Sequence, residues 1–291
     1  MSKPVIIVTG SNGQLGSELH DLQNQLPQYQ WIFASRQELD LTDSADIVRI
    51  FQQYQPEWFV NCAAYTAVDK AESEKERALA ANATAPETIA KECAKIGTKL
   101  VHISTDYVFH GDGEKPYTPA DATDPVNFYG ETKLLGEQNA LKNNAQTIII
   151  RTSWVYSTYG KNFVKTMRQL MQSRPELNVV ADQKGTPTYA KDLAAAIVTI
   201  IQSSQQHWGI YHFSNAGEIT WYDFAEEIRR ISGLDCKVNP IPTSGFPTPA
   251  KRPAYSVLDK SKLVDNYGVQ LRDWKDSLKE CIEALSETSN A

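Results

Sequence analysis

The feature that most constrains the fold of this chain is a series of short apolar runs, each followed by a helical segment. The runs occupy residues 5–9, 31–35, 58–64, 99–105 and 147–155, and apolar residues recur at helical spacing over 45–54 and 86–95. Unbroken β-branched runs are typical of strands buried on both faces of a parallel sheet. Strands that alternate with helices indicate βαβ units. The sequence therefore predicts an α/β protein with a Rossmann-like, doubly wound parallel sheet.

The pattern changes beyond residue 155, which predicts a second unit. We expect further strands at 177–182 and 210–215, and helices at 192–202, 221–231 and 274–285. Closely spaced prolines across 239–256 argue against regular structure, so this stretch is either a surface linker or a binding loop around Lys251 and Arg252. We expect residues 1–155, with 185–215 added, to form one domain. Residues 156–184 and 216–291 would form a smaller, mainly helical C-terminal domain.

Composition and charge narrow the class of partner. The 291 residues are 41% hydrophobic and 22% charged, with a net charge of −6. Without a basic arm, nucleic acid and anionic membranes are not expected as partners. No apolar run is long enough to span a membrane. The four cysteines have no C-x-x-C spacing and predict reduced thiols in a cytoplasmic protein; they are Cys62, Cys93, Cys236 and Cys281.

A glycine-rich turn follows the first apolar run. The sequence TGSNGQLG places Gly10, Gly13 and Gly16 between a predicted strand and a predicted helix. Free backbone N–H groups at a helix start bind phosphate well. The spacing is G-x-x-G-x-x-G, whereas the commonest dinucleotide fingerprint is G-x-G-x-x-G. By itself the loop is therefore as consistent with a tight turn as with a dinucleotide site.

The end of the second predicted strand indicates which dinucleotide would bind. Ser35 and Arg36 stand where an NAD-binding domain would carry an acidic residue for the ribose 2′-hydroxyl. A serine and an arginine suit a 2′-phosphate, which favours NADPH and leaves NADH possible; the alternative is a plain surface arginine. We expect Asp40 and Leu41 at the end of a short third strand, beside the adenine. Small residues after the next strand, from Asn61 to Thr66, would let the backbone approach the ligand.

Tyr129 and Lys133 are the most informative pair. Four residues apart on a helix, they share one face, and a nearby ammonium lowers the pKa of a phenol. Tyr129 could then exchange a proton with a carbonyl or alcohol. The spacing is common on surface helices, so the pair alone is weak evidence for a catalytic site. The run 99–105 ends in Ser104 and Thr105, followed by Asp106, which brings hydroxyls and a carboxylate to the same sheet edge.

These segments together resemble the extended short-chain dehydrogenase/reductases, and within them a branch that reduces 4-keto sugar nucleotides. The resemblance extends over nearly the whole chain. The matching blocks are TGSNGQLG at 9–16, NCAAYTAVDKAE at 61–72, STDYVF at 104–109, YGETKLLGE at 129–137, RTSWVY at 151–156, DQKGTPT at 182–188 and PTPAKRP at 247–253, followed by SVLD at 256–259.

The resemblance implies a role for each matched residue. The expected cofactor-binding residues are Gly10, Gly13, Gln14, Leu15, Ser35, Arg36, Asp40, Leu41, Ala63, Ala64, Thr66, Tyr129 and Lys133. The expected catalytic residues are Thr105, Tyr129 and Lys133, and the expected substrate contacts are Thr105, Asp106, Trp154 and Arg252. The implied reaction transfers hydride from NADPH to the 4-keto carbon of dTDP-6-deoxy-L-lyxo-4-hexulose, giving dTDP-L-rhamnose for polysaccharide synthesis.

Two other functions remain open from the sequence. One is a non-catalytic, NADP-binding regulatory subunit, against which the intact set of Thr105, Tyr129 and Lys133 argues. The other is an epimerase or dehydratase of the same superfamily. A dehydratase would need a carboxylate pair beside the tyrosine, and an epimerase would retain NAD, which Arg36 disfavours.

Some members of the family hold a magnesium ion with carboxylates at a subunit contact. Here Lys191 stands where we expect an acidic residue, and only Glu18 and Asp192 remain. Two carboxylates make a weak site for a hard cation, so we do not expect a resident metal. A dimer that depends on the metal is likewise not expected, and the oligomeric state is left as monomer or homodimer.

Overall fold

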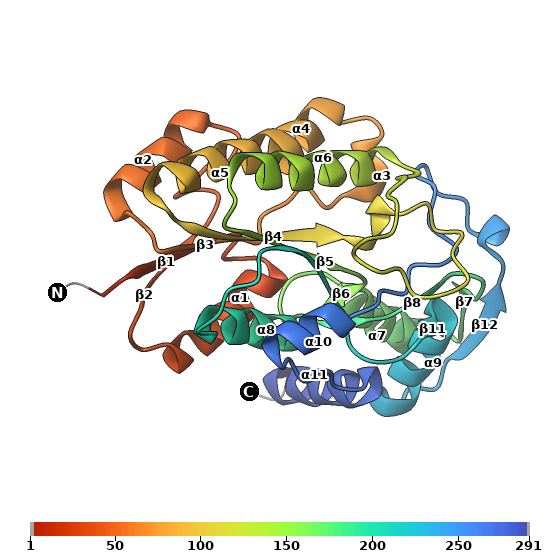
Figure 1. Cartoon of the computed structure of the whole chain (residues 1–291). Helices are drawn as coiled ribbons and strands as arrows, with labels where there is room; N and C mark the ends of the chain where they lie inside the picture. The colour runs from red at the N-terminus through yellow and green to blue at the C-terminus, as the bar shows by residue number, and fades with distance from the viewer. Residues whose placement is uncertain (1–2, 290–291) are drawn as a thin grey trace.

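Six strands form one parallel sheet in the order β10-β5-β4-β3-β1-β2 (Figure 1). The computed structural model describes residues 3–289. The strands are β1 Val5–Thr9, β2 Gln30–Ala34, β3 Trp58–Asn61, β4 Lys99–Thr105, β5 Thr147–Thr152 and β10 Gly209–Phe213. The chain adds β2 on one side of β1 and β3 on the other, so the order reverses beside β1. Open α/β sheets bind ligands at such a switch point, beyond the carboxyl ends of the strands.

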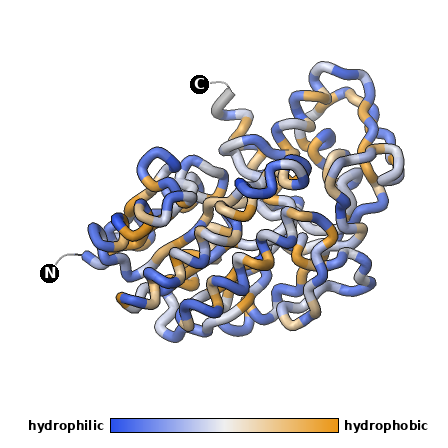
Figure 2. The backbone as a smooth tube through the Cα atoms, turned by 90° about the horizontal axis from the view of Figure 1, so that it is seen from above, coloured by the Kyte–Doolittle hydropathy of each residue, from blue (hydrophilic) through white to orange (hydrophobic). Residues whose placement is uncertain are grey.

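Helices cover both faces of the sheet. One face carries α2 Ser44–Tyr54, α5 Ala85–Ile96 and α6 Phe128–Asn143, and the other carries α1 Gln14–Leu22, α8 Ala190–Gln202 and α10 Ser261–Tyr267 (Figure 1). Alternate strand residues enter the two cores: Ile6 and Val8 pack toward α1 and α8, and Ile7 packs toward α2. All three are fully buried, and each such side chain stabilises the fold by about 1.5–3 kcal/mol. Figure 2 shows hydrophobic and hydrophilic residues alternating along the outer helices, as expected of one-sided burial.

The second lobe packs at the carboxyl end of the sheet. Its helices are α7 Phe163–Ser173, α9 Trp221–Ser232 and α11 Trp274–Ser289. Its strands form three pairs: β6 Val155–Tyr156 with β9 Thr188–Tyr189, β7 Glu176–Val180 with β12 Lys237–Ile241, and β8 Lys184–Gly185 with β11 Ile219–Thr220. Phe224 of α9 and Leu278 of α11 are fully buried between these helices. We expected all of 216–291 in this lobe, but Leu263 and Tyr267 of α10 pack in the core beneath the sheet.

Short helices fill the connections. α3 Val68–Ala71, α4 Lys75–Leu79 and the π-helical turn Ala80–Thr84 lead from β3 into α5. The 3₁₀ turns are Gln23–Gln25, Asp106–Val108 and Thr243–Gly245. Within residues 3–289 no helix combines the length and apolar character needed to cross a membrane.

Three expectations about the elements were wrong. Asp40 does not end a third strand, because its carboxylate accepts hydrogen bonds from the backbone and hydroxyl of Thr42 and forms a turn before α2. The run 147–155 is two strands, because Trp154 adopts a positive φ of 48° between β5 and β6. The proline-rich stretch also contains regular structure, since Pro240 lies in β12. A proline is tolerated there because β12 pairs with β7 along one edge, which leaves its other edge without a strand partner.

Candidate active site

The glycine turn brings three backbone segments into close contact. Gly10 has a φ of +65°, and a Cβ there would lie 2.9 Å from the backbone nitrogen of Ala63. A Cβ on Gly16 would lie 2.3 Å from the carbonyl oxygen of Gly10. Gly13 begins α1 without a capping side chain, so the N–H groups of the first helical turn face the adjoining cavity. This cradle fits an anionic diphosphate bound through backbone N–H groups.

Substituting Gly16 with alanine should destabilise the turn, because the added methyl group would meet the backbone of Gly10, which cannot move aside as a flexible side chain would. We expect the free energy of unfolding to fall by about 1–3 kcal/mol, with weaker NADPH binding. Urea unfolding and an NADPH titration measure the two effects. Gly245→Ala is the matched control, since a Cβ there has no neighbour closer than 3.4 Å. Equal behaviour of the two variants would contradict this account of the turn.

One cavity of about 960 Å³ lies along the carboxyl ends of the strands. It is large enough for a dinucleotide and part of a second ligand. Of the residues expected to bind cofactor or substrate, the cavity wall contains Gly10, Gly13, Gln14, Leu15, Ser35, Arg36, Asp40, Leu41, Ala63, Ala64, Thr66, Thr105, Asp106, Tyr129, Lys133 and Trp154. Arg252 alone is not in the wall. The structure therefore brings together residues that are more than a hundred positions apart in the sequence.

Arg36 stands at the β2 end of this cavity. Its side chain is exposed, and it forms no ion pair with any residue between 3 and 289. A free guanidinium at the ribose end is available for a phosphate, which it binds with two parallel hydrogen bonds. Ser35 lies beside it, with its backbone N–H donated to the Glu38 carboxylate at 2.7 Å.

Close packing of α6 on the loop after β4 places Tyr129 beside Thr105. Asn127 caps α6 by accepting the backbone N–H of Gly130 at 2.8 Å. A Cβ on Gly130 would lie 2.2 Å from the carbonyl oxygen of Tyr107, so the helix approaches this loop as closely as a glycine allows. The rings of Tyr129 and Tyr107 meet edge to face with centroids 5.6 Å apart. Both contacts fix the position of the Tyr129 phenol.

Lys133 is 1% exposed, one turn along α6 from Tyr129. Its ammonium donates a hydrogen bond to the carbonyl oxygen of Ile103 at 2.6 Å. Burial lowers the pKa of Lys133 to about 8, and the nearby Glu137 carboxylate offsets part of this fall. Lys133 is thus a cation near neutral pH that loses its charge within the working range of many enzymes.

The expectation that Lys133 lowers the pKa of Tyr129 was wrong for this arrangement. Burial raises the pKa of Tyr129 well above its usual value, the Thr105 side chain offsets part of the rise, and Asp106 adds to it. The physical reason is that Lys133 turns its ammonium to a backbone carbonyl. The phenol is therefore fully protonated at neutral pH, the state needed to donate a proton.

Asp106 is the buried carboxyl of the site. It accepts a hydrogen bond from the Thr105 hydroxyl at 2.9 Å through Oδ1, and its Oδ2 has no partner among the described residues. Burial raises the pKa of Asp106 to about 6. An unsatisfied buried oxygen in a cavity wall favours a ligand hydroxyl as its partner.

A buried polar network underlies the strand ends. Thr9 donates its hydroxyl hydrogen to Asn61 Oδ1 at 2.7 Å, and Asn61 Nδ2 lies 3.0 Å from His102 Nδ1. If the amide donates, His102 is neutral with its hydrogen on Nε2. Burial and the charge of Lys133 both lower the pKa of His102. The network ties β1, β3 and β4 together in register just below the cavity.

Sequence reasoning missed several residues of the site. Asn82 is fully buried and clamps the backbone N–H and C=O of Tyr65 while donating to Thr132 on α6. The sequence shows it only as part of a glycosylation-like triplet, so a packing role had no local signal. Arg77 and Lys161 also line the cavity. Lys161 had a signal, since it follows Gly160 in a polar segment directly after a predicted strand.

One aromatic ring closes the second-lobe end of the cavity, and a second ring supports it. Trp154 lines the cavity and stacks on Trp221 with ring centroids 3.6 Å apart and planes 14° apart. Gly185 also packs against the Trp154 ring, since a Cβ there would lie 2.6 Å from it. The positive φ of Trp154 is uncommon for a bulky residue and is maintained by this packing.

Arg252 joins the two lobes. Its guanidinium forms hydrogen bonds of 2.9 and 2.8 Å to the two carboxylate oxygens of Asp69. Asn127 donates to the carbonyl oxygen of neighbouring Lys251, so the proline-rich segment is fastened next to the start of α6. The expected contact of Arg252 with substrate stays a prediction.

Comparison with known proteins agrees with this fold. A family model described as the RmlD substrate binding domain matches residues 4–287. The spore coat polysaccharide biosynthesis protein SpsK of Bacillus subtilis is 41% identical, over 97% of this chain and 98% of that protein. The dTDP-4-dehydrorhamnose reductase of Sinorhizobium fredii is 40% identical, over 96% and 97%. The structure of dTDP-4-dehydrorhamnose reductase from Bacillus anthracis in complex with NADP superposes with a TM-score of 0.93 at 38% identity, covering 97% of this chain and 100% of that one.

The fold and the site define a nicotinamide-dependent oxidoreductase of the extended short-chain dehydrogenase/reductase type. Within that class, the chain belongs to the RmlD family.

Proposed function

We propose that this protein is an NADPH-dependent reductase of the 4-keto group of dTDP-4-dehydro-L-rhamnose. The observation that carries the proposal is the convergence of Thr105, Asp106, Tyr129 and Lys133 on one wall of a cavity that begins at the glycine turn. The relatives that bear the reductase name match the chain over nearly its whole length, which supports the same reaction here.

The residues present fit a bound NADPH. The glycine cradle and the uncapped start of α1 would hold the diphosphate, and Ser35 with Arg36 would hold the 2′-phosphate. Ala63, Ala64 and Thr66 would lie along the dinucleotide, with Asp40 and Leu41 at its adenine. NADPH, when bound, supplies the hydride for the keto carbon.

The chain's own groups position the substrate and supply the proton. The Thr105 hydroxyl and the free Oδ2 of Asp106 would hold the sugar, and Trp154 would pack against it. Tyr129, held protonated by burial, would donate its phenolic proton to the oxygen that becomes an alcohol. Lys133, whose ammonium donates to the Ile103 carbonyl and not to the phenol, would hold the ribose of the nicotinamide beside Tyr129. These groups account for orientation and charge stabilisation at the reacting carbonyl.

Activity should fall as pH rises through the pKa of Lys133. The folded-state pKa is about 8, below its usual value, so the ammonium is present below that pH and is lost above it. We expect kcat to fall about tenfold per pH unit beyond the break. A pH profile of kcat at saturating NADPH and keto sugar measures this. Lys133→Arg, which keeps its charge, should lose the break; a wild-type profile that is flat into the alkaline range would contradict the assignment.

A coupled assay from dTDP-glucose through the keto intermediate, run with NADPH and with NADH, tests the reaction and the cofactor together. We expect absorbance of the nicotinamide to fall only when the keto sugar nucleotide is present, and faster with NADPH. NAD that co-purifies with the protein would instead favour an epimerase. A stoichiometric enzyme partner without keto-sugar turnover would favour a regulatory subunit.

We further propose a cytoplasmic enzyme that works as a monomer or homodimer on a dTDP-sugar. The four cysteines are all free thiols, which agrees with a reducing compartment. Size-exclusion chromatography with light scattering distinguishes the two oligomeric states.

A further inference from the structure

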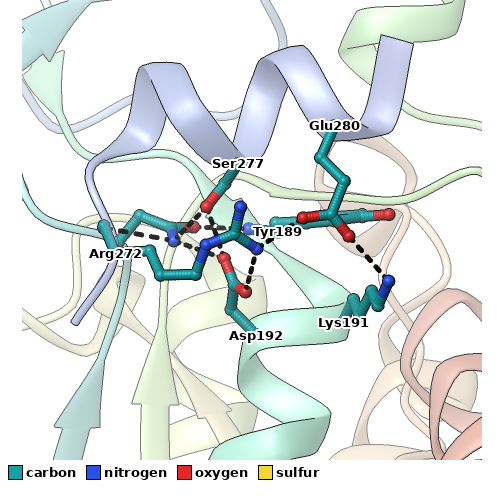
Figure 3. A network of polar contacts seen from close by, with 7 residues as sticks. Tyr189, Lys191, Asp192, Arg272, Ser277 and Glu280 are labelled. Carbon is teal, nitrogen blue, oxygen red and sulfur yellow. Dashed lines mark hydrogen bonds and ion pairs between the residues drawn. The ribbon is translucent and has the colours of Figure 1, made fainter. Parts of the chain in front are cut away.

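A group of charged side chains connects the start of α8 to α11, outside the wall of the cavity (Figure 3). Lys191 Nζ lies 2.6 Å from Glu280 Oε1. Arg272 Nη1 lies 2.7 Å from Glu280 Oε2 and 3.0 Å from Asp192 Oδ1. Each oxygen of Glu280 therefore faces its own cation, and Arg272 bridges the two carboxylates.

The remaining oxygen of Asp192 is also occupied. Oδ2 accepts hydrogen bonds from the Ser277 hydroxyl at 2.5 Å and from Asn215 Nδ2 at 2.6 Å. Asp192 is thus held by one guanidinium, one hydroxyl and one amide. Every carboxylate oxygen of Asp192 and Glu280 therefore already faces a hydrogen-bond donor or a cation of this chain.

The charge of Lys191 also acts on a carboxylate of α1. Glu18 of α1 is 4% exposed and accepts a hydrogen bond from the Ser157 hydroxyl. Burial raises the pKa of Glu18, and the charge of Lys191 partly offsets the rise. One ammonium therefore compensates carboxylates on both α1 and α11.

This arrangement does not fit the magnesium ion that some members of the family hold. A magnesium site needs several free oxygen ligands in octahedral geometry at about 2.1 Å. In the part of the chain that the structure describes, no group of three or more His, Cys, Asp or Glu residues could hold a metal. Here the third acidic position is a lysine, and its ammonium would repel a divalent cation.

We propose that the ammonium of Lys191, together with the guanidinium of Arg272, supplies as tethered cations the positive charge that Glu18, Asp192 and Glu280 require, so that the fold needs no divalent metal. The proposal concerns the stability of the contact among α1, α8 and α11 and does not depend on the reaction. It follows that removing metals leaves this protein unchanged, whereas replacing Lys191 with an acid creates a need for a cation.

Thermal unfolding of the full chain tests this with EDTA or with an excess of MgCl₂. We expect the Tm of the wild type to agree in the two conditions within about 1 °C. Lys191→Glu should have a lower Tm in EDTA, which MgCl₂ raises by about 2–4 °C. Lys279→Glu is the matched control, because it makes the same charge change on α11 at a side chain that is 65% exposed. Its Tm should not respond to MgCl₂.

A wild-type Tm that falls in EDTA and recovers with MgCl₂ would overturn the proposal. So would a Lys191→Glu variant that folds and responds to MgCl₂ no more than the control does. If that variant does not fold, titration of the wild type with MnCl₂, followed by the electron paramagnetic resonance signal of free Mn²⁺, decides the matter. We expect the signal of free Mn²⁺ to stay undiminished, because the ammonium of Lys191 occupies the place of a cation. Stoichiometric loss of the signal would show that the protein binds Mn²⁺ and would contradict the proposal.

Discussion

Tyr129→Phe is expected to lower kcat for keto-sugar reduction by about 10²–10⁴-fold, the usual contribution of a positioned general acid. The substitution removes only the phenolic oxygen, and the ring keeps its edge-to-face contact with Tyr107. Without that proton the developing alkoxide would depend on neighbours such as the Thr105 hydroxyl, which already donates to Asp106 Oδ1. Because the fold and the glycine turn are untouched, the loss should appear in the chemical step.

Single-turnover kinetics with the keto sugar nucleotide, together with an NADPH titration, separate hydride transfer from cofactor binding. The dissociation constant for NADPH should change little while the rate of hydride transfer falls. Tyr159→Phe is the control, since its hydroxyl bonds to Asp21 and lies outside the cavity wall. Normal turnover by Tyr129→Phe would refute Tyr129 as the proton donor.

Glu137→Gln is expected to lower the free energy of unfolding by about 3–5 kcal/mol, because it leaves a buried charge without its partner. Glu137 accepts hydrogen bonds from Arg151 Nε at 2.9 Å and Nη2 at 2.7 Å, and both side chains are 2% exposed. The guanidinium of Arg151 lies 5.0 Å from the centre of the Phe109 ring and is enclosed between α6 and the sheet. Glutamine has nearly the same shape, so the loss reports charge rather than a cavity.

Urea unfolding measures the effect, with Glu87→Gln as the control. Glu87 pairs with Lys91 on the exposed face of α5, where an ion pair contributes about 0–1 kcal/mol. Glu137 also acts to raise the pKa of Lys133, so the variant's pH–activity profile should break at a lower pH than the wild type's. A loss as small as that of the control would contradict a buried charge pair.

The sequence was sufficient for the sheet and for just under half of the residues in the cavity wall. Alternating apolar runs and helices depend on local periodicity, and the glycine turn and Tyr129 with Lys133 are short-range patterns. The topology then brings their strand ends to one edge, which is why distant residues such as Arg36 and Trp154 share one cavity.

The turn at Asp40 is set by local hydrogen bonds from Thr42, so its signal lies in the sequence and was missed. Features that depend on long-range contacts could not be predicted. The positive φ of Trp154 is set by the packing of Trp221 and Gly185. The protonated state of Tyr129 depends on burial, and the sequence shows spacing but not the direction of the Lys133 ammonium.

The most direct test of the central claim uses NADPH carrying deuterium at the transferable position of nicotinamide C4, with dTDP-6-deoxy-L-lyxo-4-hexulose as substrate. Mass spectrometry and nuclear magnetic resonance of the product locate the label. We expect dTDP-L-rhamnose with one deuterium on the sugar C4. A product without deuterium there, or no product while NADPH remains bound, would contradict a reductase.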